Sequence, residues 1–93
     1  MIFLGETVCI EAIIKDFVGN LVDPEKHEIE IYDPSGSLMA TFTAPIREDK
    51  GKYYICYTLP QDGLTGLWKA VWKVTANEII EKEEIDFFVE ENG

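Results

Sequence analysis

The sequence predicts an all-β protein, a sandwich of about seven short antiparallel strands. Two stretches carry most of this prediction, Gly51–Leu59 and Gly66–Val74, and each begins with a glycine and then alternates between two faces. A period of two over this length is typical of a strand with one buried face. Both tryptophans and three of the four tyrosines lie here, and aromatic side chains bury the most area per residue. The residues expected to face the core are Tyr53, Ile55, Tyr57, Leu59, Trp68, Ala70, Trp72 and Val74.

Other segments show the same alternation and are separated by turn signals. Asp33-Pro34-Ser35-Gly36 is the strongest turn, because proline presets φ, aspartate bonds to its own backbone and glycine closes the turn. Arg47–Lys50 is expected to be a charged loop. Glu78–Glu84 has helical propensity, but a helix there would bury only two isoleucines, so a hairpin loop and an early strand are expected instead. The other expected strands are Met1–Leu4 (a short edge strand), Glu6–Lys15, His27–Asp33, Ser37–Ala44 and Glu81–Glu90. In Ser37–Ala44 the residues expected in phase on the core face are Leu38, Ala40 and Phe42.

Length and charge limit the classes of function. A chain of 93 residues, 46% hydrophobic and 12% aromatic, is expected to form one folded domain, residues 1–93, with one core. Eighteen acids against eight bases give a net charge of −10, which argues against nucleic acid and anionic membranes as partners. No apolar run approaches the ~20 residues of a membrane span, and Met1–Leu4 does not resemble a signal peptide. The chain as written is expected to start in the cytoplasm, although a virion component or an excised extracellular domain could start in the same way.

A set of short motifs occurs along the chain in the order in which one known domain family has them. Phe3-Leu-Gly-Glu-Thr-Val8 matches an aromatic-x-Gly-Glu-x-Val opening, although Leu4 stands where that family usually has proline. Ile29-Glu-Ile-Tyr-Asp-Pro-Ser-Gly36 matches a strand followed by Asp-Pro-x-Gly. Gly-x-Tyr, Leu-Pro and Gly-x-Trp landmarks follow at Gly51-Lys-Tyr53, Leu59-Pro60 and Gly66-Leu-Trp68. Together these motifs resemble the macroglobulin-type, fibronectin-III-like domain of alpha-2-macroglobulin-like proteins.

The resemblance covers nearly the whole chain and implies an immunoglobulin-like, fibronectin-III-like sandwich used as a spacer or contact module. Some proteins of that family carry a reactive thioester built from a Cys-Gly-Glu-Gln-type motif. Neither Cys9-Ile-Glu nor Cys56-Tyr-Thr matches this motif, so thioester chemistry is not expected here.

The resemblance also bears on the pairing of the two cysteines. In the implied fold Glu6–Lys15 and Lys52–Leu59 are antiparallel neighbours, and one register places Cys9 opposite Cys56 on the outer face of the sheet. Directly opposite positions lie roughly 4.5–5.5 Å apart at Cα, within reach of a disulfide. The alternative, two unrelated reduced thiols, is the commoner state in a cytosolic protein.

No motif points to catalysis, a cofactor or a metal centre. His27 is the only histidine and is expected at the end of a strand, partly exposed, rather than as the base of a nucleophilic cysteine. The cysteines lack Cys-x-x-Cys zinc spacing, and there is no phosphate-binding glycine loop or Gly-x-Ser-x-Gly elbow. Calcium is the ion that fits best, because it takes oxygen ligands from loops. The acids that a sandwich could gather at one end are Asp16, Asp23, Glu25 and Asp33.

Several apolar residues are out of phase with the core pattern and are expected on the outer faces of the sheets. If they cluster on one face, they form a candidate protein interface. They are Ile13, Met39, Tyr54, Val71, Ile80 and Phe88.

Two classes of function remain open from the sequence. The first is a non-enzymatic structural or protein–protein interaction module, such as a spacer, adhesion or particle-assembly domain of a phage-like virion, that binds a protein partner or itself. The second is a calcium- or ligand-binding accessory domain of a larger enzyme or surface protein, which would use loop acids or exposed tyrosine and tryptophan. The acidity fits a soluble surface or a docking surface for a basic partner or cations. Buried tryptophans would favour the first class and exposed ones the second.

Overall fold

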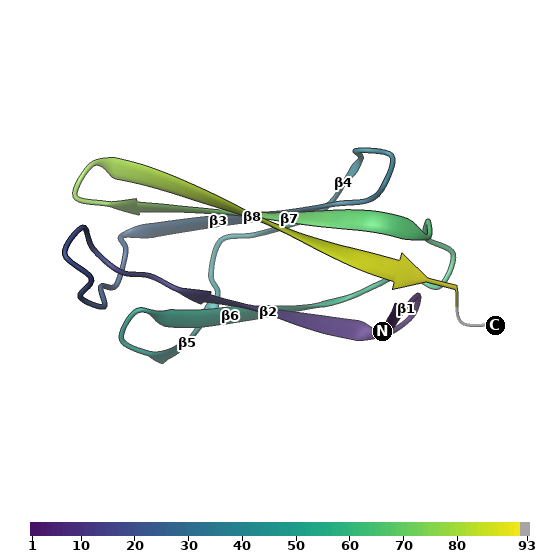
Figure 1. The fold of residues 1–93 in the computed structure, drawn as a ribbon, viewed down its shortest axis with the longest axis horizontal. Coiled ribbons are helices and arrows are strands. Elements are labelled where there is room, and N and C mark those ends of the chain that lie inside the picture. The colour runs from purple at the N-terminus through teal and green to yellow at the C-terminus, as the bar shows by residue number, and fades with distance from the viewer. Residues whose placement is uncertain (92–93) are drawn as a thin grey trace.

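The computed structural model describes residues 1–91, and the all-β prediction is confirmed: these residues form strands and turns and no helix. They lie in two sheets, one of five strands in the order β1-β8-β7-β3-β4 and one of three in the order β2-β6-β5 (Figure 1). The absence of helices means that residues 1–91 contain no long apolar helix that could cross a membrane. The strands are β1 (Ile2–Phe3), β2 (Thr7–Ile13), β3 (Lys26–Tyr32), β4 (Leu38–Phe42), β5 (Ile46–Asp49), β6 (Lys52–Thr58), β7 (Gly66–Ala76) and β8 (Ile79–Glu90).

Neighbouring strands are antiparallel except at one edge of the larger sheet. There β1 runs parallel to β8, with Ile2 opposite Val89 and Phe3 opposite Glu90. The longest pairing is the β7–β8 hairpin, which turns at Asn77–Glu78. Both of these residues have positive φ, 51° and 67°, which is the geometry of a tight two-residue hairpin turn.

The core lies between the two sheets, and the inner faces predicted for β6 and β7 are confirmed. Trp68 is fully buried and Trp72 nearly so, while Leu59, Ile29 and Val89 close the space around them. The indole Nε1 of Trp68 donates to the backbone oxygen of Leu64 over 2.8 Å, so this ring is buried with its polar group satisfied. Each fully buried aliphatic side chain contributes about 1.5–3 kcal/mol to the stability of the fold.

Two strand predictions were wrong, and both failures have a local cause. The expected charged loop at Arg47–Lys50 is largely strand β5, an edge strand whose residues are all exposed and whose pairing with β6 shifts register between Arg47 and Asp49. A bulged, fully exposed strand has no apolar alternation to reveal it. In β4 a register shift places Leu38 opposite Tyr32 on the outer face, where Leu38 is half exposed instead of facing the core. Residues 1–91 therefore form eight strands, one of them parallel to its neighbour, rather than about seven antiparallel ones.

The molecule is elongated along its strands, with extents of 46 × 23 × 20 Å. The β2–β3 connection, the β5–β6 turn and the β7–β8 hairpin lie together at one end, on the left in Figure 1. We call this the loop end. The short strand β1 and the β3–β4 turn lie toward the other end.

Candidate functional site

The β2–β3 connection at the loop end is a closed, hydrogen-bonded loop. Lys15 and Leu21 form an isolated antiparallel bridge across its base. At its tip the carboxylate of Asp16 accepts hydrogen bonds from the backbone N–H groups of Val18 (3.0 Å) and Asn20 (2.9 Å). The bond from Asn20 is the largest of the interactions that hold the pKa of Asp16 below its usual value. The loop therefore has a defined backbone conformation although it projects into solvent.

This ordered loop presents an aromatic side chain to solvent. Phe17 is fully exposed, and its neighbour Val18 is 76% exposed. On the facing hairpin Ile79 and Ile80 are 64% and 70% exposed. A cavity of about 640 Å³ lies between these two elements and is lined by Phe17, Val22, Ile79, Glu25, Lys50 and Glu81, among others. The loop end thus combines an apolar rim with a hollow of mixed charge.

Asp23 fastens the loop to the smaller sheet. Its Oδ1 accepts hydrogen bonds from Arg47 Nε (3.2 Å), the Gly51 N–H (2.9 Å) and the Tyr53 hydroxyl (2.8 Å), and its Oδ2 accepts one from Arg47 Nη2 (3.1 Å). The Arg47 guanidinium, followed by the Gly51 N–H and the Tyr53 hydroxyl, holds the pKa of Asp23 far below its usual value. Burial, and then Asp23, raise the pKa of Tyr53. Four donors from the β5–β6 region therefore fix the base of the β2–β3 loop.

A second contact ties the two sides of the loop end together. The Glu25 carboxylate accepts a hydrogen bond from the Asn77 N–H at the turn of the β7–β8 hairpin, over 3.0 Å. The backbone N–H of Glu25 itself donates to the Thr75 oxygen over 2.8 Å. These two hydrogen bonds therefore fix the position of the β7–β8 hairpin relative to the β2–β3 loop on the two sides of the cavity.

His27 lies beneath this network as a packing residue. It is half-buried in β3, its ring centroid is 4.3 Å from that of Tyr53, and its Nδ1 accepts a hydrogen bond from Trp72 Nε1 over 3.2 Å. Burial lowers the pKa of His27, against a smaller opposing effect of Asp23. It contacts aromatic residues of both sheets, Tyr53 and Trp72, and is partly exposed as expected.

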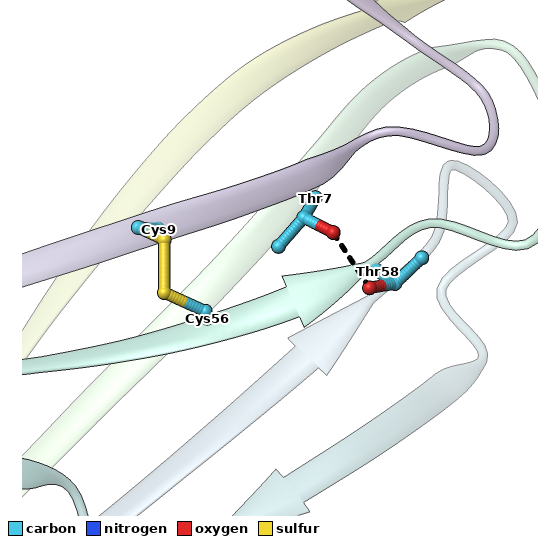
Figure 2. Close-up of a disulfide and its surroundings, with 4 residues drawn as sticks. All are labelled: Thr7, Cys9, Cys56 and Thr58. Carbon is cyan, nitrogen blue, oxygen red and sulfur yellow. Dashed lines mark hydrogen bonds between the residues drawn. A yellow bond between two sulfur atoms is a disulfide. The ribbon is translucent and has the colours of Figure 1, made fainter.

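The two cysteines lie opposite each other on β2 and β6 (Figure 2). Their Cα atoms are 4.1 Å apart, and their sulfur atoms are joined in a disulfide of 2.07 Å. Both Cys9 and Cys56 are exposed on the outer face of the smaller sheet, and the Thr7 and Thr58 hydroxyls share a 2.7 Å hydrogen bond beside them. The bridge joins two neighbouring strands of one sheet and leaves no free thiol among residues 1–91.

The four acids considered as calcium ligands are divided between the two ends. Asp16, Asp23 and Glu25 lie at the loop end, and each carboxylate is occupied by the N–H or guanidinium donors described above. Asp33 lies in the β3–β4 turn, where the Ser35 N–H (2.9 Å) and hydroxyl (2.6 Å) donate to it. Within residues 1–91 no three histidine, cysteine or acidic side chains come together in a way that could hold a metal ion.

The out-of-phase apolar residues do not form one patch. Ile13 and Tyr54 share the outer face of the smaller sheet with the disulfide, whereas Ile80 and Phe88 lie on the outer face of the larger sheet. Met39 lies at the register shift of β4. Val71 is only 6% exposed, because it lies in a central strand flanked by the paired chains Lys69–Glu84 and Lys73–Glu30, so it is not an accessible contact residue.

Phe17 and Val18 were not among the expected contact residues. The signal that could have found them is two consecutive apolar residues inside the turn Asp16-Phe-Val-Gly-Asn20, where polar residues are usual. The turn itself is visible in the sequence, but the exposure of the two side chains that it displays is not. Leu67 on β7 and Phe88 on β8 form a second pair of neighbouring exposed apolar side chains, since they lie directly opposite each other.

Comparisons with known proteins give no relative for this chain: no protein-family model matches it, and no curated protein or solved structure matches it significantly.

Proposed function

We propose that this chain is a non-enzymatic protein–protein interaction module and that it binds its partner at the loop end. We further propose that its sandwich is of the immunoglobulin-like, macroglobulin type. The pairing of β2, β6 and β5 in one sheet and of β3, β7 and β8 in the other supports this, because it corresponds to the BED and CFG sheets of immunoglobulin-like domains. One difference is that the disulfide joins neighbouring strands of one sheet, whereas in antibody domains it joins the two sheets.

The observation that carries the proposal is the full exposure of Phe17 on a loop that is held in place. A flexible loop could fold an aromatic ring back onto the surface. Here the hydrogen bonds that the Asp16 carboxylate accepts, together with the anchor at Asp23, keep the loop extended away from the core. A rigid, exposed aromatic side chain loses little conformational entropy on binding, and such residues supply much of the energy of protein interfaces.

The alternative function, a calcium- or ligand-binding accessory domain, has less support. Trp68 and Trp72 are 0% and 3% exposed, so neither ring offers a surface on which a ligand could stack. The loop acids accept hydrogen bonds from the chain itself. Four large apolar side chains are exposed at the loop end, Phe17, Val18, Ile79 and Ile80, which fits a protein surface better than a polar ligand.

The partner is proposed to be a different protein with an apolar recess, not a second copy of this chain. Two copies would each bring a net charge of −10 to the contact, and like charges of this size oppose association. Light scattering on a sizing column over a concentration series, with and without reductant, tests this point. A monomer throughout is the expected result, and a stable oligomer would contradict it.

Site-directed crosslinking tests the loop end itself. A photoreactive residue at position 17, introduced in the organism that makes this protein, should crosslink to one partner protein. The partner is then purified, and its affinity for the chain is measured by calorimetry. Phe17→Ser should weaken that binding about thirtyfold, as expected for a central hot-spot residue. Phe88→Ser is the matched control, because Phe88 is 59% exposed but lies on the outer face of the larger sheet, and it should change the affinity less than twofold. Equal effects of both variants, or none from Phe17→Ser, would contradict the proposal.

A further inference from the structure

Strand β8 has a long backbone edge, most of which is not paired with any other strand of residues 1–91. One edge pairs with β7 from Ile79 to Val89, whereas the other pairs with β1 only at Val89 and Glu90. Along the ten residues Ile79–Phe88, every second residue of β8 therefore presents its backbone N–H and C=O groups away from the sheet. An edge of this length is a template for the addition of a strand.

The edge borders a groove that leads into the space between the sheets. A cavity of about 450 Å³ lies between β8 and β2, and its floor contains Trp72 and Val74 of β7. Glu81 and Glu83 of β8 are paired with Val74 and Trp72, so they share the inward face of the larger sheet. Ile13 lines the β2 side of the same cavity.

Among residues 1–91 the two inward-facing acids on this edge form no ion pair, although Lys15 and Lys82 line the same cavity. The ion pairs of residues 1–91 engage Glu84, which lies 3.6 Å from both Lys69 and Lys82, but neither Glu81 nor Glu83. Both are exposed although they lie on the face that packs on the core further along the strand. Two carboxylates at alternate positions of an open edge form a fixed acidic pattern with a spacing of two residues.

The β8 edge already accepts a strand at its C-terminal end. Ile2 and Phe3 lie parallel to it, and the N–H of Leu4 donates to the Glu90 oxygen over 3.0 Å. The geometry of β8 is therefore compatible with strand pairing on this side. A second copy of β8 is a poor occupant of the remaining edge, because four of the six residues Glu81–Asp86 are acidic and pairing would place like charges opposite each other.

We propose that the free edge of β8, residues 79–88, binds an extended segment of a partner protein with basic residues at two alternate positions. The segment adds a strand to the larger sheet, and its basic side chains lie opposite Glu81 and Glu83 in the groove above Trp72. At the next inward positions it carries apolar residues, which contact the half-buried Ile85 and Phe87. The edge begins beside the loop-end cavity, which Ile79 and Glu81 also line, but it binds through the backbone of β8 and does not depend on the function proposed for Phe17.

Short peptides that contain this pattern provide the test. The probe is Thr-Lys-Thr-Lys-Thr-Val-Thr-Val-Thr, used together with its reversed sequence because the partner strand can run in either direction. The control peptides carry glutamate in place of both lysines. Titration is followed by amide chemical shifts and by hydrogen exchange of the whole chain. Saturable binding of one lysine peptide, with new protection of alternate amides between Glu81 and Asp86, is expected, and the glutamate peptides should bind at least tenfold more weakly.

Charge-neutralising variants locate the contact. Glu81→Gln combined with Glu83→Gln should weaken the lysine peptide about threefold to tenfold, because two cross-strand ion pairs are lost. Glu48→Gln combined with Asp49→Asn makes the same change in net charge on the exposed edge strand β5 and should have less than a twofold effect. Phe17→Ser should leave peptide binding unchanged, which separates this test from that of the loop end.

Three outcomes would overturn the proposal. One is the absence of saturable binding by either lysine peptide. Another is equal loss of affinity in the Glu81/Glu83 and Glu48/Asp49 variants, which would reduce the effect to net charge. The third is protection of amides in Thr7–Ile13 instead of β8, which would place the added strand on β2.

Discussion

The indole Nε1 of Trp72 donates a hydrogen bond to Nδ1 of His27, over 3.2 Å between adjacent strands of the larger sheet. The bond requires an unprotonated Nδ1, because a protonated nitrogen has no lone pair to accept it. The His27 ring also lies against Tyr53, whose hydroxyl donates to Asp23. The only histidine therefore connects the core tryptophan of β7 to the anchor of the β2–β3 loop.

Protonation of His27 should destabilise the fold. Burial holds the pKa of His27 below its ordinary value of 6.5, so the unfolded chain binds this proton more readily than the folded one. The free energy of unfolding should be unaffected by His27 above pH 6.5. It should fall as the pH drops below 6.5, and the loss should level off once the folded state is also protonated.

Urea unfolding between pH 8 and pH 5.5 measures this effect. His27→Asn keeps an acceptor near the Trp72 Nε1–H but does not titrate, so it should lose most of the pH dependence in this range. If the free energy of unfolding of the wild type and of His27→Asn changed with pH in the same way, His27 would not contribute to the pH dependence of stability.

Asp23→Asn should loosen the loop end and reduce acid sensitivity. Asparagine cannot form an ion pair with Arg47. Its amide nitrogen is itself a donor and would face one of the groups that donate to Asp23, from Arg47, Gly51 or Tyr53. The folded pKa of Asp23 is depressed, so the stability it contributes is present above the usual pKa of 3.8 and is lost as the pH falls below that value.

Thermal unfolding from pH 7 down to pH 2 checks this prediction. At pH 7 the Asp23→Asn variant should melt at a lower temperature than the wild type, and the difference should shrink at the acid end. Asp62→Asn is the control, since Asp62 is exposed at the other end of the molecule, and the melting temperature of this variant should follow that of the wild type throughout. A constant difference at all pH values would indicate lost packing rather than lost charge.

The sequence predicts the core of this fold well and its loop end poorly, for a physical reason. The inner faces of β6 and β7 are visible because period-two alternation encodes burial directly, and Trp68 and Leu59 are buried as expected. The anchor at Asp23 joins residues of the β2–β3 loop, β5 and β6 that lie more than twenty positions apart. No local pattern encodes such a contact, and the exposure of Phe17 depends on it.

Loss of the disulfide should weaken the fold without changing it. The bridge closes a loop with a sequence separation of 47 residues, and removing such a link costs about 2–4 kcal/mol. Replacement of both Cys9 and Cys56 by serine should therefore lower the melting temperature by roughly 8–32 °C, at ~4–8 °C per kcal/mol for a domain of this size. The circular dichroism spectrum should be retained.

The exposure of the bridge makes a separate prediction about its chemistry. Because both cysteines are exposed, a reductant should reach the disulfide without unfolding of the chain. Alkylation of the native protein without reductant, followed by intact-mass analysis, should label neither cysteine. With reductant both should be labelled, at a rate that low concentrations of urea do not change. Labelling before reduction would show that the thiols are free.

Gly51→Ala should be more disruptive than Gly36→Ala, because two independent costs coincide at Gly51. Gly51 has φ +71°, and a Cβ added to it would lie 2.8 Å from the backbone oxygen of Ile14. Gly36 also has a positive φ, +87°, but open space surrounds its Cβ position. Gly36→Ala should therefore cost about 1 kcal/mol for backbone conformation alone, and Gly51→Ala about 1–3 kcal/mol more for the clash.

The clash at Gly51 falls on the backbone that holds the loop end. The Ile14 N–H donates to the Gly51 oxygen over 2.7 Å, and the Ile14 oxygen accepts from Val22. A displaced Ile14 carbonyl would therefore move the base of the β2–β3 loop away from β6. Chemical denaturation of Gly51→Ala beside Gly36→Ala measures the difference, and hydrogen exchange of the Ile14 and Val22 amides locates it. Equal costs for the two variants would mean that the contact between Gly51 and Ile14 relaxes freely and does not position the loop.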